Sequence, residues 1–408
     1  MSKNQNRRFR NVSRTACTGL LISLSPLQLA LAEGSAQTGL TQPLNDFTQQ
    51  LNSGATDDAS ASLYVDILSA GEVINVSLCG TSQASNVSVE IFSPTDDTTP
   101  VFTESLNDGN VDCNSPMTDP LTTPMRFQTT EPGTYRLVLE TSSRFDRYDV
   151  SVTPDMNTDP DPSIAAGRLW AFNYGFLTGS FGEAASTDAN YFALLPGGRP
   201  NTNYIWMLDL NNFAGNGYDL VANSIGLDAP NSGYSASASG NSVTHEHPLY
   251  LGVPAVANGR PVVDPNISAV SFLDDIGQDN SITPGATPGE QDTGVFEFTT
   301  DVEGTYQIAI DLNQDQIFGN TGDRILIGRT TPGLNSVIWD GMTADQNEPA
   351  LGDYAVQVRV NTGEFHFIAN DVETSGGSEP GLTIFASDQA GNLTDTCLLY
   401  TSDAAAKA

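Results

Sequence analysis

The sequence predicts an all-β protein built of tandem antiparallel β-sandwiches. Apolar residues alternate with polar ones in short segments along the whole chain, and no segment keeps an apolar period of 3.6 residues. The 37 glycines and 23 prolines interrupt these segments often, as the many turns of an all-β protein require. A chain of 408 residues is too long for one ordinary domain, and its short apolar segments indicate several small cores.

The chain is strongly acidic, with a formal net charge of −33. Between Glu33 and Thr396 it has no lysine and only ten arginines against 48 acidic residues. A surface of this charge repels nucleic acid and anionic membranes, so neither is expected as a partner. The same carboxylates are oxygen ligands of the kind that calcium prefers.

Residues 1–32 have the features of a signal peptide. Four arginines between Arg7 and Arg14 precede an apolar stretch, which ends in Ala30-Leu31-Ala32. A retained membrane anchor is the alternative, but the stretch is shorter than the ~20 residues of a span, and Pro26 interrupts it. We therefore expect an exported protein, extracellular or at the cell surface, with the periplasm as the alternative and no membrane insertion after signal removal.

Two of the four cysteines, Cys79 and Cys113, fall in the first mature unit. Cys17 belongs to the signal segment and Cys397 to the C-terminal tail. In an exported protein we expect Cys79 and Cys113 to form a disulfide, worth about 3–4 kcal/mol in the chain-entropy model. A metal site at these cysteines is the alternative, but no histidine lies nearby in the sequence.

Residues 38–155 form the first predicted unit. Its strand signals include 63–78 and 87–91, and it closes with Gly133-Thr-Tyr135 followed by alternating apolar residues and by Tyr148-Asp-Val-Ser-Val152. This closing part resembles the bacterial pre-peptidase C-terminal domain. The resemblance implies a small jelly-roll-like sandwich that serves as an accessory module, sometimes calcium-bound, without catalytic residues.

A linker over 156–164, rich in proline and aspartate, leads to a second unit over 165–268. Aromatic strand segments run over 169–176, 191–195 and 204–210, and turn residues dominate between Asn211 and Thr244. We expect a β-sandwich of unassigned type. Most of these aromatic residues are expected in its core, and an exposed glycan-binding platform is the alternative.

Residues 269–396 form the third predicted unit. The Gly-x-Tyr strand opening of the first unit recurs here at Tyr306 and at Tyr354, and Trp339-Asp-Gly341 precedes the latter. The Trp-Asp-Gly, spacer, Gly-x-Tyr order resembles the immunoglobulin-like domain of flagellar hook-capping proteins and other bacterial surface proteins. The resemblance implies an immunoglobulin-like sandwich with Trp339 in its core.

The tail over 397–408 contains CLLYTSDAA, which resembles a translated sequencing adapter. We interpret this segment as artefactual, with the natural chain continuing beyond Thr396. A natural tail is the alternative.

One loop has the composition of a calcium site. Its candidate ligands are the side chains of Asp311, Asn313, Asp315 and Asp323 and the backbone carbonyl of Ile317. The spacing resembles the calcium loops of EF-hand-like and dockerin-like proteins. It departs from them at Gln316, where glycine normally makes the turn, and at Gly322, where a bidentate Glu belongs. An acidic β-turn without metal is the alternative.

His245-Glu246-His247 is the only histidine cluster, and in a strand its two imidazoles would share one face. A zinc or copper site is the metal interpretation, and a polar loop is the alternative. The sequence has no G-x-S-x-G, no H-E-x-x-H, no P-loop and no dinucleotide fingerprint.

We therefore expect the N-terminal part of a non-catalytic, exported multidomain protein of adhesion or ligand binding, stabilised by calcium. A glycan or a cell-surface group is the expected partner. The first alternative is an accessory region of a secreted hydrolase whose catalytic domain lies beyond Thr396. The second is that the aromatic-rich unit over 165–268 is itself an enzyme.

Overall fold

The computed structural model describes residues 33–34, 48–50, 62–79, 87–106, 124–141, 147–160, 167–177, 189–210, 213–214, 217–226, 244–274, 280–284, 291–370, 374–375, 382–387 and 393–395. All regular secondary structure in these residues is β-strand, and every strand pair is antiparallel. The predicted all-β fold of antiparallel sheets is confirmed. The signal segment, Cys113 and the tail lie outside the described residues, and of Cys79 only its place in a strand is described.

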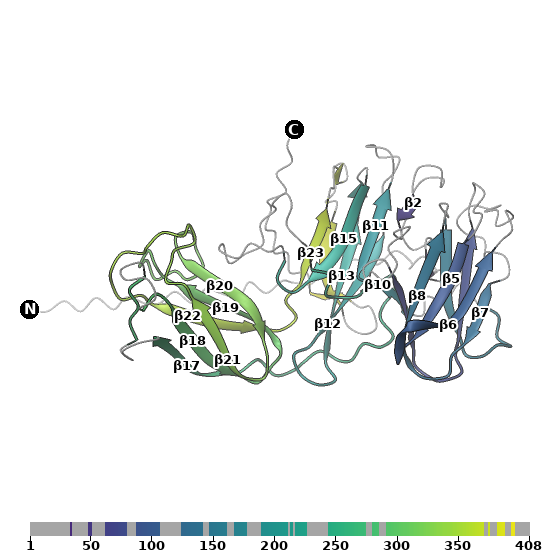
Figure 1. The fold of residues 1–408 in the computed structure, drawn as a ribbon, viewed down its shortest axis with the longest axis horizontal. Coiled ribbons are helices and arrows are strands. Elements are labelled where there is room, and N and C mark those ends of the chain that lie inside the picture. The colour runs from purple at the N-terminus through teal and green to yellow at the C-terminus, as the bar shows by residue number, and fades with distance from the viewer. Residues whose placement is uncertain are drawn as a thin grey trace, which may run out of the picture.

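Most strands belong to one large body, which occupies one end of the molecule in Figure 1. Its main element is a ten-stranded sheet. In sheet order its strands are β26 (Leu393–Asp395), β25 (Leu382–Ser387), β13 (Asn203–Leu210), β12 (Asn190–Pro196), β16 (Leu249–Tyr250), β10 (Leu169–Ala171), β3 (Leu63–Ile67), β8 (Gly133–Thr141), β5 (Val87–Ser93) and β6 (Asp96–Leu106).

Two four-stranded sheets complete the large body, together with a small ribbon. One sheet has the order β1 (Glu33–Gly34), β9 (Arg147–Thr153), β4 (Val73–Cys79) and β7 (Met125–Gln128). The other has the order β2 (Thr48–Gln50), β11 (Asn173–Leu177), β15 (Gly217–Asn223) and β23 (His366–Asn370). The ribbon pairs β14 (Phe213–Ala214) with β24 (Thr374–Ser375).

A single hydrophobic core joins the three larger sheets of this body. It contains Leu63 from the ten-stranded sheet, Val76 from β4 and Leu220 from β15, all with at most 1% of their surface exposed. These residues alternate with partly exposed ones along their strands, as expected for sheets with one face on a core.

The remaining strands form a separate sandwich, the distal sandwich, at the other end of the molecule (Figure 1). One sheet has the order β17 (Ile267–Asp274), β18 (Gly294–Thr300) and β21 (Gly333–Trp339). The other has the order β20 (Arg324–Thr330), β19 (Gly304–Ile310) and β22 (Val356–Asn361). A second core lies between these sheets. Trp339 is part of it and is 6% exposed, so its predicted core position is confirmed.

Two of the three strand-opening tyrosines cap their corners, and the third, Tyr306, packs against the core of the distal sandwich. The Tyr135 hydroxyl donates a hydrogen bond to the carbonyl of Glu131 at 3.1 Å, and the Tyr354 hydroxyl donates to the carbonyl of Ala350. Each bond spans four residues and closes the turn before the strand, which fixes how the strand enters its sheet.

The structure joins the predicted units more closely than their sequence boundaries suggest. Strands β3 and β10, from the predicted units 38–155 and 165–268, pair directly through Tyr64 and Trp170. Strands β23 and β25, from the predicted unit 269–396, leave the distal sandwich and pair in the large body. The start of the linker is also held in place, because the Arg126 guanidinium donates to the carbonyl oxygens of Asp155, just before it, and of Met156 and Thr158 at 3.3, 3.0 and 2.6 Å.

Candidate functional site

The predicted calcium loop connects two neighbouring strands of the distal sandwich. It begins at Asp311, directly after β19, and ends at Asp323, directly before β20. These strands pair from Gly304↔Thr330 to Ile310↔Arg324, so the loop closes a β-hairpin. The loop therefore lies between two strands, whereas an EF-hand loop lies between two helices.

The loop carboxylates point inward and accept hydrogen bonds from the loop backbone. The two oxygens of Asp311 accept the backbone N–H groups of Asp315 at 3.1 Å and Gln316 at 2.9 Å. Asp315 accepts the N–H of Ile317 at 2.8 Å, and Asn313 accepts the N–H of Asp315 at 3.0 Å. The predicted ligand residues are therefore gathered in one compact turn.

Asp323 closes the loop from its other end. Its Oδ2 accepts the backbone N–H of Gly319 at 2.7 Å and that of Asn320 at 3.3 Å. Its Oδ1 is buried and has no hydrogen-bond partner among the described residues. Asp323 is 5% exposed and Asp311 is 2% exposed, so two carboxylates are buried at the two ends of the loop. A buried carboxylate oxygen without a partner is energetically costly, and a bound cation would satisfy it.

The backbone explains both departures from the EF-hand-like spacing. Gln316 lies in the left-handed region at φ 64°, the conformation that glycine adopts at this position in such loops. Gly322 has φ 110°, and a side chain there would lie 3.0 Å from Asn313 Nδ2. A glutamate at 322 would be strained, which leaves Asp323 as the acidic residue that enters the loop.

The side chains do not form a preassembled metal cluster. Among the described residues no group of three or more His, Cys, Asp or Glu side chains is arranged to hold a metal ion, the loop aspartates included. The ligand types suit calcium, because all are oxygens. Metal binding would need the loop carboxylates to converge on one point. The His245–His247 pair likewise forms no such cluster.

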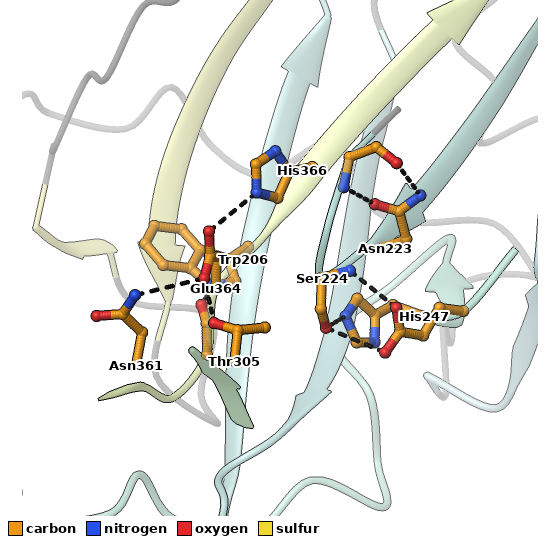
Figure 2. A network of polar contacts seen from close by, with 11 residues as sticks. Trp206, Asn223, Ser224, His247, Thr305, Asn361, Glu364 and His366 are labelled. Atoms are coloured by element: carbon orange, nitrogen blue, oxygen red, sulfur yellow. Dashed lines mark hydrogen bonds and ion pairs between the residues drawn. The ribbon is translucent and has the colours of Figure 1, made fainter. Parts of the chain in front are cut away.

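His247 instead belongs to a polar network at the junction of the two bodies (Figure 2). Its Nε2 lies 2.8 Å from the Ser224 hydroxyl, and Glu246 accepts hydrogen bonds from the Ser224 N–H at 2.9 Å and hydroxyl at 3.1 Å. Glu246 also forms a bidentate pair with Arg329 of β20 at 2.6 and 3.2 Å. The network thus ties the large body to the distal sandwich.

Burial decides the charge state of this network. Burial lowers the pKa of His247 to about 4, although the neighbouring Glu246 opposes the shift. Burial acts to raise the pKa of Glu246, but hydrogen bonds from Arg329 and Ser224 hold it below its usual range. At neutral pH the imidazole is therefore neutral and the carboxylate ionised. A Ser–His contact of this kind could activate the hydroxyl, but a histidine with so low a pKa is a weak base at neutral pH.

A second polar group lies beside the first in Figure 2. Glu364 accepts hydrogen bonds from His366 at 3.1 Å, from Asn361 at 3.5 Å and from Thr305 of β19. Next to it the Trp206 indole N–H donates to the carbonyl of Gly363 at 3.1 Å, which links β13 to the chain leaving the distal sandwich.

Sequence reasoning missed this junction. It singled out His245 and His247 as a pair by their spacing, whereas the partners of His247 and Glu246 lie 23 and 83 residues away, at Ser224 and Arg329. No local pattern could have found them. The described aromatic residues of 165–268 are not all in one core. Tyr174 of β11 and Tyr191 of β12 are fully buried in the core of the large body, whereas Phe192 points to the opposite face of the ten-stranded sheet.

Comparison with known proteins identifies no family. No protein-family model and no curated protein matches the chain. Two solved structures show a distant likeness. A DUF4785 family protein from Legionella pneumophila has a TM-score of 0.16 and 9% identity, over 88% of this chain and 84% of that one. The N-terminal tandem CBM22 domain of Xyn10C from Paenibacillus barcinonensis has a TM-score of 0.10 and 12% identity, over 82% and 84%. At these scores neither likeness supports an argument about function.

Among the residues that the structure describes, none forms a helix with the length and hydropathy needed to cross a bilayer.

Proposed function

We propose that the chain is an exported, non-catalytic binding protein whose distal sandwich is stabilised by calcium. The single observation that supports this proposal best is the buried, partnerless Oδ1 of Asp323, which lies in an acidic hairpin loop. The calcium would be held by Asp311, Asn313, Asp315 and Asp323, with the carbonyl of Ile317 as a further ligand. It would be a structural ion.

Electrostatics favours a cation at this position. Asp311 and Asp323 are both buried, and Asp315 lies between them in sequence. Backbone N–H groups supply only partial positive charge, so they do not neutralise these carboxylates. Arg324 pairs with Asp340 at 3.8 Å outside the loop. A divalent cation would offset the loop charge directly, which is the role proposed for it.

The test is a thermal melt of the purified full chain in millimolar calcium and in excess chelator. A ligand at 100 times its Kd adds about 2.7 kcal/mol to the free energy of unfolding, so we expect a clear rise in Tm with calcium. Asp323→Asn should abolish most of this rise. The matched control is Asp345→Asn, which removes one exposed acid of the same sandwich and should keep it.

Magnesium separates a specific site from general charge screening. Magnesium is smaller and demands a stricter octahedral geometry, so the same concentration should raise Tm much less than calcium. Equal shifts with both ions, or equal shifts in wild type and Asp323→Asn, would contradict a calcium site in this loop.

A further inference from the structure

The ten-stranded sheet carries a continuous row of large apolar side chains on the face opposite the core. Tyr64 lies opposite Trp170, Trp170 opposite Tyr250, and Tyr250 opposite Phe192. The row continues from Phe192 to Met207 and from Met207 to Phe385. Residues directly opposite one another in antiparallel strands project to the same face. We call these six residues the aromatic strip.

The strip belongs to neither hydrophobic core. None of its six members is part of the core of the large body or of the distal sandwich, nor of the partly buried residues packed against them. Their neighbours along the strands, such as Leu63, Leu169 and Leu208, are the ones that fill the core. Packing of the two cores therefore does not explain why this face carries the large, partly exposed side chains of Tyr64, Phe192, Met207 and Phe385.

The strip is ordered and partly exposed. Tyr64 and Trp170 stack with ring centroids 4.3 Å apart and planes inclined by 14°, and Phe172 packs edge-on against both. Tyr64, Phe192, Met207 and Phe385 are partly exposed, whereas Trp170 and Tyr250 are buried.

Tyr250 is held by a hydrogen bond to Asp66, which lies on the same face of the sheet. Its hydroxyl donates to Asp66 Oδ2 at 2.6 Å, and Thr134 donates to Asp66 Oδ1 at 2.7 Å. The hydrogen bond to Asp66 therefore fixes the position of the Tyr250 ring within the strip.

A polar row runs beside one half of the strip. Asn190 lies opposite Asp209, and Asp209 opposite Thr383, each two residues along its strand from a strip member and so on the same face. Asn190 is exposed, and the other two are partly exposed. Flat apolar groups flanked by hydrogen-bonding groups suit a ligand that has apolar C–H faces and hydroxyl edges.

The shape and charge of the surface narrow the ligand class. Five inter-strand spacings of about 4.8 Å make the strip roughly 24 Å long and one side chain wide, so it fits an extended, repeating ligand. An extended peptide would instead pair along a sheet edge through its backbone. The net charge of −33 disfavours polyanions. We propose that the aromatic strip binds a neutral polysaccharide, whose sugar rings stack on the exposed side chains.

The proposal is tested by affinity electrophoresis of the full chain through gels that contain xylan, mixed-linkage β-glucan, galactomannan or starch. Polygalacturonate serves as the anionic control. The gels are run with chelator, so that the outcome is separate from the calcium proposal. We expect at least one neutral polysaccharide to retard the wild type, and polygalacturonate not to retard it.

Substitutions in the aromatic strip test whether the polysaccharide binds there. Phe192→Ala should bind the retarding polysaccharide at least tenfold more weakly, and Phe385→Leu, which keeps apolar volume but removes the ring, should also weaken binding. Ile338→Ala is the matched control, because it shortens an apolar side chain that is 69% exposed on the distal sandwich, and it should bind like the wild type. A thermal melt of each variant checks folding.

Two results would overturn the proposal. One is that no neutral polysaccharide retards the wild type. The other is that the wild type is retarded and folded strip variants are retarded equally, because binding would then lie elsewhere on the protein.

Discussion

Glutamine in place of His247 should make the protein less sensitive to acid. His247 is 3% exposed, and its Nε2 lies 2.8 Å from the Ser224 hydroxyl. Gln reaches to about the position of Nε2 and can keep a hydrogen bond to Ser224, but it cannot take up a proton. The change therefore removes the titration while disturbing the packing little.

The size of the effect follows from the pKa of His247, which burial lowers from 6.5 to about 4. Because the folded state binds this proton more weakly than the unfolded state, stability is lost as the pH falls through the window from 6.5 to 4. Each pKa unit corresponds to 1.36 kcal/mol, so lowering the pH from 7 to 4.5 should cost about 2.5 kcal/mol through this group alone.

The measurement is urea unfolding of the wild type and His247→Gln at pH 7 and at pH 4.5. All other titrating groups are common to both proteins, so the difference between the two pH dependences isolates His247. We expect the wild type to lose about 2.5 kcal/mol more than the variant. His245→Gln, the matched control, keeps His247 and should behave like the wild type. Equal acid losses in the wild type and His247→Gln would refute the reasoning.

Three further substitutions should change the stability of the protein in a predictable direction. Burial raises the pKa of Glu33 to about 7, although hydrogen bonds from backbone N–H groups act to lower it. The folded protein therefore loses stability as the pH rises from 4.5 to 7. In urea unfolding at pH 8, the free energy of unfolding of Glu33→Gln should be up to about 3 kcal/mol higher than that of the wild type. Gln316→Gly should raise the denaturation midpoint by the equivalent of about 1 kcal/mol, because it relieves a left-handed backbone at φ 64°; an unchanged midpoint would contradict this. Gly363 has φ 69°, and a Cβ there would lie 2.4 Å from the Tyr204 ring, so Gly363→Ala should lower Tm and increase the radius of gyration in X-ray scattering. Gly259→Ala is the control, because a Cβ at this position meets nothing within 4 Å, and it should change neither Tm nor the radius of gyration.

The strands were predictable because their signal is local. Alternation over a few residues predicted β3, β4, β5 and the strands after each Gly-x-Tyr. The core position of Trp339 followed instead from the resemblance of Trp339-Asp-Gly341 and Gly352-Asp-Tyr354 to an immunoglobulin-like domain. The acidic loop was predictable for the same reason, since its residues are close in sequence. Its metal content stays a prediction.

The sheet order was not predictable, because it depends on pairing between distant segments. Nothing in the sequence near Tyr64 indicates that Trp170 is its neighbour, nor near Met207 that Phe385 lies opposite it. The aromatic strip exists only through these registers. A shift of one residue in any of the pairings would move that strand's residue to the other face, so a strip over six strands cannot be derived from alternation alone.

The two proposed sites lie in different bodies, and the junction determines how far they influence each other. The acidic loop closes one end of the β19–β20 hairpin at Ile310↔Arg324, whereas Arg329, near the other end, pairs with Glu246 of the large body. A calcium ion would therefore act on the junction only by stiffening the hairpin between them. The Arg329–Glu246 pair is half exposed, and pairs of this kind contribute about 1 kcal/mol or less. The energetic coupling of the two proposed sites through this ion pair is therefore also about 1 kcal/mol or less. Calcium binding is therefore expected to stabilise the distal sandwich, whereas the binding strength of the aromatic strip is set by residues of the large body.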